Sequence, residues 1–232
     1  AEQLRFSKMS SPDLAGHLAV RLSEGKIIGL ARGRMEFGPR GLGARSILAA
    51  ATSPDMQSKL NLRIKFRESF RPFAPMVLVE DFGEYFEGRD SEDSPYMLKT
   101  FYVQEARRVV NATSLDGFGL DRINQIRSDI PAVTHLDYSA RVQTIDRLRN
   151  PFMHEVLSIY KEITGFSVIV NTSFNVRGEP IVASADDAVR CFLLTEIDDL
   201  VIEDLYVERD AQVRSMPSAT DIQRHLDSFE LD

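Results

Sequence analysis

The sequence predicts one α/β domain in which helices cover a β-sheet. Helical and strand-like segments alternate along the whole chain, with no linker and no internal repeat between them. A length of 232 residues is enough for one sizeable hydrophobic core. The composition, 43% hydrophobic and 27% charged, is that of a folded protein and not of a disordered, collagen-like or disulfide-rich one.

The N-terminal part begins with residues 1–12, which show no clear periodicity and are expected to be a tail or the remains of a linker. A helix is predicted over residues 11–25, because proline suits a first turn and glycine ends helices. The apolar residues 26–31 predict a buried strand. This strand leads into a loop over residues 33–46, whose glycines permit tight backbone paths.

The later elements follow from apolar periodicity and from the residues that start and end helices. Helices are expected over residues 53–62, 150–163, 184–196 and 221–229, and strands over residues 76–79, 96–103, 166–170 and 200–207, with one or two more over 132–145. Residues 111–129 are expected to form a loop and then a short helix. In an α/β sheet the loops after strands usually hold the ligand, so functional side chains are sought there.

The charges are distributed unevenly along the chain. In total, 28 lysines and arginines face 35 aspartates and glutamates, and this net charge of −7 argues against a general nucleic-acid-binding surface. Residues 32–71, however, contain nine basic and three acidic residues, whereas residues 184–232 contain four basic and 13 acidic ones. Because the arginine fork binds phosphate and carboxylate groups, the basic segment predicts an anionic ligand. Solvated surface charges and ion pairs are the alternative.

The single cysteine, Cys191, excludes an internal disulfide and is typical of a reducing compartment. No apolar run is long enough to cross a membrane, and the first residues do not resemble a secretory signal, so we expect a cytoplasmic protein without a membrane partner. The four histidines are scattered, and no metal site is expected. His135 and Asp137 would share one face of a strand, but a packed or hydrogen-bonded histidine is the favoured interpretation.

Two candidate segments are rich in cations. The loop 33–46 combines glycines with Arg40 and Arg45, so its backbone and guanidinium groups could approach an anion, with a structural turn as an equal alternative. Residues 61–75 alternate cations with large apolar side chains, and an extended backbone would place these cations on one face: Arg63, Lys65, Arg67 and Arg71. A polyphosphate needs such convergent cations. The alternative is an exposed edge strand kept soluble by its charges.

Two further segments follow predicted strands. Arg141 lies between small and apolar neighbours, where pairing with a core carboxylate is the alternative to ligand binding. Residues 171–180 offer short polar side chains that can form hydrogen bonds without filling a pocket: Asn171, Ser173 and Asn175. An ordinary turn is the alternative for this last segment.

In this order, the four segments resemble the C-terminal part of the NodU-type O-carbamoyltransferase family. The matching stretches are GRMEFGPRGLGARSILA, NLRIKFRESFRPFAPMVL, PAVTHLDYSARVQTID and NTSFNVRGEPIV, and the likeness covers residues 13–209. The resemblance implies that residues 13–232 form a single YrdC-like domain, with a twisted, mostly mixed sheet covered by helices. The chain departs from the family in Gly41, where alanine is usual, and in residues 50–52 and 137–138.

Members of this family have a larger N-terminal domain of the actin-like ATPase fold, which transfers a carbamoyl group to an acceptor hydroxyl. Their C-terminal domain binds ATP and carbamoyl phosphate and makes carbamoyl adenylate. The resemblance therefore implies that this chain corresponds to the C-terminal part alone and acts with such an N-terminal domain. The chain lacks an initial Met, and both a piece of a longer protein and a naturally separate protein stay open as interpretations. ATP is the implied nucleotide substrate, accompanied by Mg²⁺.

The resemblance also implies roles for individual residues. Catalytic roles fall to Lys65, Arg71, Arg141 and Ser173, and binding roles extend to Arg40, Asn171 and Asn175. Two other hypotheses remain: a non-catalytic nucleotide- or anion-binding module that supports a partner domain, and an RNA-binding or tRNA-modifying protein. The negative net charge argues against the latter, so nucleic acid is not an expected partner.

Overall fold

The computed structural model describes all residues except 1–3, 90–91, 110–124, 213–217 and 230–232. Its helices are α1 (Ser11–Ser23), α2 (Met56–Arg63), α3 (Phe82–Tyr85), α4 (Pro151–Thr164), α5 (Ala185–Leu194) and α6 (Ala219–Leu226). Its strands are β1 (Ser7–Lys8), β2 (Ile28–Ala31), β3 (Arg45–Ala50), β4 (Ala74–Leu78), β5 (Thr100–Tyr102), β6 (Ser139–Arg141), β7 (Gln143–Ile145), β8 (Val168–Ser173), β9 (Asp199–Ile202) and β10 (Leu205–Glu208).

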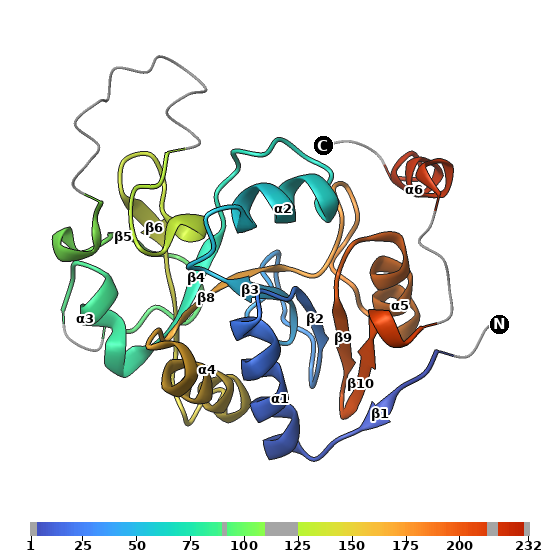
Figure 1. The fold of residues 1–232 in the computed structure, drawn as a ribbon, viewed down its shortest axis with the longest axis horizontal. Helices are drawn as coiled ribbons and strands as arrows, with labels where there is room; N and C mark the ends of the chain where they lie inside the picture. The colour runs from blue at the N-terminus through green and yellow to red at the C-terminus, as the bar shows by residue number, and fades with distance from the viewer. Residues whose placement is uncertain (1–3, 90–91, 110–124, 213–217, 230–232) are drawn as a thin grey trace.

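Over the described ranges, these strands form a large mixed sheet and a small two-stranded one. The large sheet has eight strands in the order β1-β10-β9-β2-β3-β8-β4-β7, and β5 pairs with β6 in the other. β3 is central and antiparallel to both β2 and β8, while β2 pairs in parallel with β9, and β4 with β7. A mixed sheet covered by helices confirms the predicted fold class (Figure 1).

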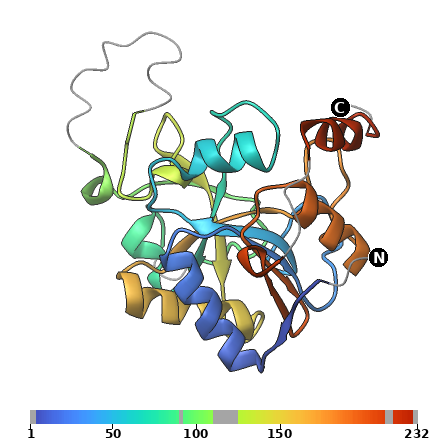
Figure 2. The same cartoon turned by 45° about the vertical axis from the view of Figure 1, so that its right-hand side comes forward.

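Two hydrophobic clusters lie on opposite faces of the large sheet. Helices α1 and α4 pack side by side on one face, over strand residues that include Leu48 and Ile169. Helices α2 and α5 and the small sheet cover the other face, toward which Ile47 and Val170 point (Figures 1 and 2). Because successive strand residues point to opposite faces, the central strands are buried on both sides.

Side-chain caps mark the starts of four predicted helices, α1, α4, α5 and α6, whose ends shift only slightly from the prediction. Helix α1 begins where the Ser10 side chain accepts a hydrogen bond from the N–H of Asp13, and α4 where Asn150 accepts one from Met153. Gly165, with a φ of 79°, ends α4 in the left-handed conformation that favours glycine. No helix formed by the described residues has both the length and the apolar character that a membrane span requires.

Some strand predictions were wrong. Strand β3 was not predicted, because it has a single β-branched residue, Ile47, and no alternation of apolar and polar residues, although it is buried at the centre of the sheet. Residues 200–207, expected as one strand, form β9 and β10, joined by a turn in which Glu203 has a φ of 54°. Within the expected tail 1–12, β1 pairs with β10 at the sheet edge and α1 begins. A two-residue edge strand is too short to produce a periodicity.

The strand expected from residue 132 begins only at Ser139. Pro131–Val133 form a 3₁₀ turn, and Tyr138 has a φ of 64°, so the backbone turns before β6. His135 and Asp137 therefore do not lie on one strand face. Of the loop and helix expected over residues 111–129, residues 111–124 lie outside the described ranges, and residues 125–129 form no helix.

The basic segment 61–75 is not an extended strand. Helix α2 continues to Arg63, Phe66 has a φ of 47°, and β4 starts only at Ala74. The segment is thus a helix end followed by an irregular loop. Its four cations do not share a strand face, and the loop decides where each of them points.

Candidate functional site

The C-terminal end of β8 borders a small polar pocket, which we call the arginine pocket. Its volume is about 120 Å³. Three arginines from distant segments line it: Arg40 from the loop after β2, Arg67 from the loop after α2, and Arg141 from β6. The other lining residues are Pro39, Gly41, Pro72, Phe73, Ala74, Met97, Asn171, Thr172 and Ser173.

Carboxylates of the described residues counter the charges of these arginines only weakly, with Glu68 acting on Arg67 from beyond ion-pair distance. The ion pairs formed within the described ranges include none of the three, and Arg141 Nε is buried there without a hydrogen-bond partner. Burial lowers the pKa of Arg141, and the charge of Arg40 lowers it further. Burial likewise lowers the pKa of Arg67 to about 10, with a contribution from Arg71. Partly desolvated cations with such weak counter-charges indicate an anion site.

The amide of Asn171 has a defined orientation at this pocket. Its Nδ2 donates to the carbonyl oxygen of Gly41 at 3.0 Å and to Gln143 Oε1 at 2.6 Å. Gln143 Nε2 donates in turn to the carbonyl oxygen of Leu42 at 2.8 Å. Since carbonyls only accept, both amides must turn their NH₂ groups toward this loop. Asn171 Oδ1 is buried with no partner among the described residues, so it is free to accept from a ligand.

A second cavity, which we call the lysine pocket, adjoins the arginine pocket. Its volume is about 210 Å³, and it shares Arg67 and Ser173 with the arginine pocket. Its other lining residues are Lys65, Arg71, Asn175, Val176, Arg177 and Gly178. Because four basic side chains surround it, this cavity also suits an anion.

The ammonium group of Lys65 is fully engaged by the protein. Its Nζ donates to the carbonyl oxygens of Ser173 at 2.5 Å and Asn175 at 2.9 Å, and to Asn175 Oδ1 at 2.9 Å. An ammonium group has three protons, so these three bonds leave none for a ligand. Ser173 Oγ donates to the same Asn175 Oδ1 at 2.7 Å. Lys65 therefore holds the turn after β8 in place.

The burial of Lys65 predicts a pH-dependent stability. Burial lowers its pKa from about 10.5 to about 7, although its three acceptors favour the ammonium form. Between these values the unfolded chain binds a proton that the folded chain has released, so stability rises with pH. We expect the difference in unfolding free energy between wild type and Lys65→Met to grow in favour of wild type from about pH 7 to pH 10, measured in urea. A constant difference would contradict the lowered pKa.

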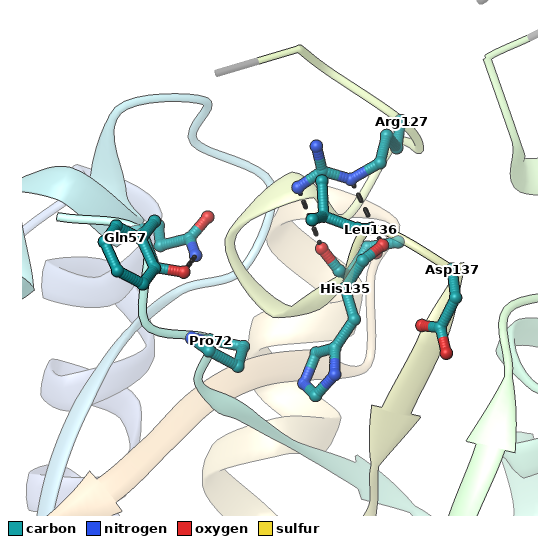
Figure 3. A pocket seen from close by; sticks show the side chains of 8 residues that line it. Gln57, Pro72, Arg127, His135, Leu136 and Asp137 are labelled. Atoms are coloured by element: carbon teal, nitrogen blue, oxygen red, sulfur yellow. Dashed lines mark hydrogen bonds between the residues drawn. The ribbon is translucent and has the colours of Figure 1, made fainter. Parts of the chain in front are cut away.

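A third and mostly apolar cavity of about 300 Å³ shares Pro72 with the arginine pocket. In Figure 3, Gln57 and Pro72 lie on one side of it, and His135 and Leu136 on the other. Phe70, Thr134 and Asp137 complete its lining together with Arg127. Arg127 donates to the carbonyl oxygens of Thr134 and His135 at 3.2 and 3.1 Å, and so braces the turn that carries Leu136.

The two charged side chains of this apolar cavity, Arg127 and Asp137, are hydrogen-bonded to neighbouring protein groups. Burial lowers the pKa of His135 and so favours the neutral form of its ring. Asp137 Oδ1 accepts hydrogen bonds from the N–H and Oγ of Ser139 at 3.0 and 2.7 Å. In the part of the chain that the structure describes, no group of three or more His, Cys, Asp and Glu side chains could hold a metal ion. A flat, uncharged ring suits this cavity better than an ion.

The structure places the seven candidate residues around two adjoining pockets rather than one. Arg40, Arg141, Asn171 and Ser173 line the arginine pocket, and Lys65, Arg71, Asn175 and again Ser173 line the lysine pocket. Arg71 is half exposed and pairs with Glu68 at 2.9 Å. Arg63 lines neither pocket, because it pairs with Glu196 at 2.9 Å on the surface.

Sequence reasoning missed the central place of Arg67, which borders both pockets. Its even spacing from Lys65 was a signal, but the same spacing also included Arg63. Gln143 was missed as well, since only the structure shows that it fixes the Asn171 amide.

Gly41 allows an unusually close approach between the loop after β2 and the end of β8. A Cβ atom at this position would lie 2.4 Å from the carbonyl oxygen of Arg45 and 3.0 Å from Ser173 Cα. Both of these atoms belong to the backbone and cannot move aside cheaply. Glycine therefore lets the loop lie against β8, where its carbonyl groups reach Asn171 and Gln143.

Comparisons with known proteins agree on one family. Residues 19–209 match the family model described as "Carbamoyltransferase C-terminus". An uncharacterized Synechocystis protein, sll1178, is 46% identical over 100% of this chain and 37% of its own length. The nodulation protein NolO of Bradyrhizobium diazoefficiens is 38% identical over 86% of this chain and 33% of its own length. The 3'-hydroxymethylcephem-O-carbamoyltransferase of Streptomyces clavuligerus is 37% identical over 83% and 32%. The chain thus spans about a third of the length of these relatives.

Proposed function

The chain belongs to the carbamoyltransferase C-terminal family, and on that premise we propose that it binds ATP and carbamoyl phosphate and forms carbamoyl adenylate. A domain in the remaining two thirds of a longer protein, of the actin-like fold, would then transfer the carbamoyl group to an acceptor hydroxyl. The observation that carries the proposal is the row of three cavities, in which the arginine pocket shares residues with each of the other two.

The order of the cavities matches the order of groups in the reactants. The apolar cavity beside Pro72 takes the adenine ring, and the arginine pocket takes the α-phosphate together with the carbamoyl group. The lysine pocket, with Arg71 and Arg177, takes the β- and γ-phosphates that leave as pyrophosphate. Arg67, at the boundary of the two cationic pockets, lies where the breaking bond would be.

The chemistry requires little covalent participation by the protein. Water first cleaves carbamoyl phosphate into carbamate and inorganic phosphate. A carbamate oxygen then attacks the α-phosphorus of ATP, and the bond from this phosphorus to the bridging oxygen breaks as pyrophosphate leaves. Negative charge grows on phosphate oxygens, which Arg67 and Arg141 stabilise from fixed positions.

Asn171 suits the carbamoyl group in particular. Its Oδ1, which has no hydrogen-bond partner among the described residues, is a pure acceptor, and the carbamoyl NH₂ group is a donor. Arg141 Nε, likewise without a partner in the described ranges, can donate to a carbamoyl or phosphate oxygen. Together these two atoms favour a ligand that has a donor and an acceptor side by side.

The described residues do not fit a protein-held Mg²⁺ ion. Within the described ranges, no three His, Cys, Asp or Glu side chains come together as they would in a metal site. Any Mg²⁺ in the reaction would therefore arrive as part of Mg·ATP, and no step above depends on a metal bound by side chains.

Carbamoyl-phosphate-dependent exchange of radioactive pyrophosphate into ATP tests the proposed function. The 232-residue chain is expected to catalyse this exchange with Mg·ATP, and to lose it when carbamoyl phosphate is left out. Binding of ATP without any exchange, also after a purified N-terminal domain has been added back, would support the alternative of a non-catalytic nucleotide-binding module.

Replacing Leu136 tests the assignment of the apolar cavity. Leu136 is 57% exposed at the cavity rim, and Leu136→Ala removes apolar contact with the base. We expect the Kd of ATP to rise about tenfold, and that of pyrophosphate to stay unchanged, in calorimetric titrations. The matched control is Leu148→Ala, at an exposed leucine that lines none of the three cavities. Equal weakening of ATP and pyrophosphate by Leu136→Ala would contradict the assignment.

A further inference from the structure

We propose that Glu36 is a positioning residue, whose carboxylate holds the loop after β2 so that Arg40 and the Asn171 amide face the arginine pocket. The functional part of this inference rests on the proposed function. Glu36 lines none of the three cavities, so any effect on catalysis must pass through the residues that it holds.

One oxygen of Glu36 gathers three backbone N–H groups. Oε1 accepts from Leu42 at 2.6 Å, from Ala44 at 2.7 Å and from Arg45 at 3.3 Å. A carboxylate only accepts, and bonds to a charged acceptor are stronger than those between neutral groups. This oxygen therefore closes the loop between residue 36 and the start of β3, and fixes the backbone on both sides of residue 43.

The carbonyl groups of the same turn point the other way, toward the site. The carbonyl oxygens of Gly41 and Leu42 accept from Asn171 Nδ2 and Gln143 Nε2. The orientation that leaves Asn171 Oδ1 free thus depends on where Glu36 holds this turn. A loop that drifted outward would release both amides and let them rotate.

Residues 33–40, the described first part of this loop, have little apolar packing. The side chains on either side of Glu36 point to solvent, with Met35 40% exposed and Phe37 fully exposed. Arg40 is also exposed, and no ion pair fixes it within the described residues. Side-chain hydrogen bonds therefore hold the loop: Ser46 Oγ accepts from the N–H of Gly43 at 2.9 Å, and Glu36 accepts from three N–H groups near the same turn.

The test measures three quantities on the same samples: the kinetics of pyrophosphate exchange into ATP, the binding of pyrophosphate, and the exchange of backbone amide hydrogens. Glu36→Ala is expected to raise the KM for carbamoyl phosphate at least tenfold and to lower kcat about tenfold. The Kd of pyrophosphate should stay within twofold, since the lysine pocket does not depend on this loop. Glu36→Gln keeps an oxygen acceptor but loses the charge, so its values should lie between those of wild type and Glu36→Ala. Phe37→Ala, at the exposed neighbour, is the matched control and should behave as wild type.

The amides of residues 42, 44 and 45 give a readout that does not depend on activity. Their protection against hydrogen exchange should fall at least tenfold in Glu36→Ala. Unchanged amide protection in Glu36→Ala would overturn the inference, whatever the enzyme assay shows. A wild-type protein that catalysed no pyrophosphate exchange would instead reject only the proposed function. Wild-type kinetics of Glu36→Ala would also overturn the inference. If Glu36→Ala does not fold, Glu36→Gln decides, and a KM within twofold of wild type would contradict the inference.

Discussion

Replacing Arg141 with alanine is expected to lower carbamoyl-phosphate-dependent exchange at least about 100-fold, because removal of one fixed donor to a developing charge typically costs that much. Arg141 Nε is buried without a partner among the described residues, and burial lowers the pKa of its guanidinium group. Because the Arg141 guanidinium group forms no ion pair within the described ranges that would stabilise the fold, its charge is available to bind an anionic ligand.

The stability of the Arg141→Ala variant separates a functional arginine from a structural one. Because no carboxylate in the described part of the chain pairs with Arg141, we expect a Tm equal to or above that of wild type. Arg141→Lys keeps the charge without the planar fork and should recover about a tenth of the activity. The control is Arg149→Ala, at an exposed arginine paired with Asp93, which should leave the exchange unchanged. A large loss of Tm in Arg141→Ala would indicate a structural role instead.

Replacing Lys65 with methionine is expected to damage both stability and activity. Three partly buried acceptors on Ser173 and Asn175 each lose one hydrogen bond from a charged donor, which together costs about 3 kcal/mol of unfolding free energy and lowers the Tm by about 6–12 °C. The turn after β8 is then released at both cationic pockets, so exchange should fall at least about 100-fold.

Thermal unfolding and exchange assays of Lys65→Met check this prediction together. Lys59→Met, at a lysine of α2 that lines neither cationic pocket, is the matched control and should change neither quantity. If the activity of Lys65→Met fell while its Tm stayed at the wild-type value, the ammonium group would act on the ligand directly and not through the turn after β8.

The local parts of the fold were predictable because local residues determine them. Ser10 and Asn150 cap their helices by bonds to residues three positions away, and Gly165 ends α4 through its own φ. Strand β3 forms because it is buried between two helical layers. A strand that is buried on both faces shows no alternation of apolar and polar residues that could be seen in the sequence. Short edge strands such as β1 depend on a partner that follows much later in the sequence.

The segments of the candidate site were predictable, but the direction of their side chains was not. An extended backbone would have placed Arg63 beside Arg67, whereas the helix end at Arg63 and the turn at Phe66 point the two arginines to different surroundings. The three acceptors that occupy Lys65 are mostly backbone oxygens, which no residue type reveals. Tertiary contacts therefore decide which cations face a ligand and which hold the loops around it.

A crystal structure of the chain with α,β-methylene-ATP, which cannot release pyrophosphate, tests the central claim most directly. We expect the adenine ring in the apolar cavity beside Pro72, the α-phosphate within hydrogen-bond distance of the Arg141 and Arg67 guanidinium groups, and the outer phosphates in the lysine pocket. Phosphates bound elsewhere, or both cationic pockets empty at a saturating nucleotide concentration, would contradict the account.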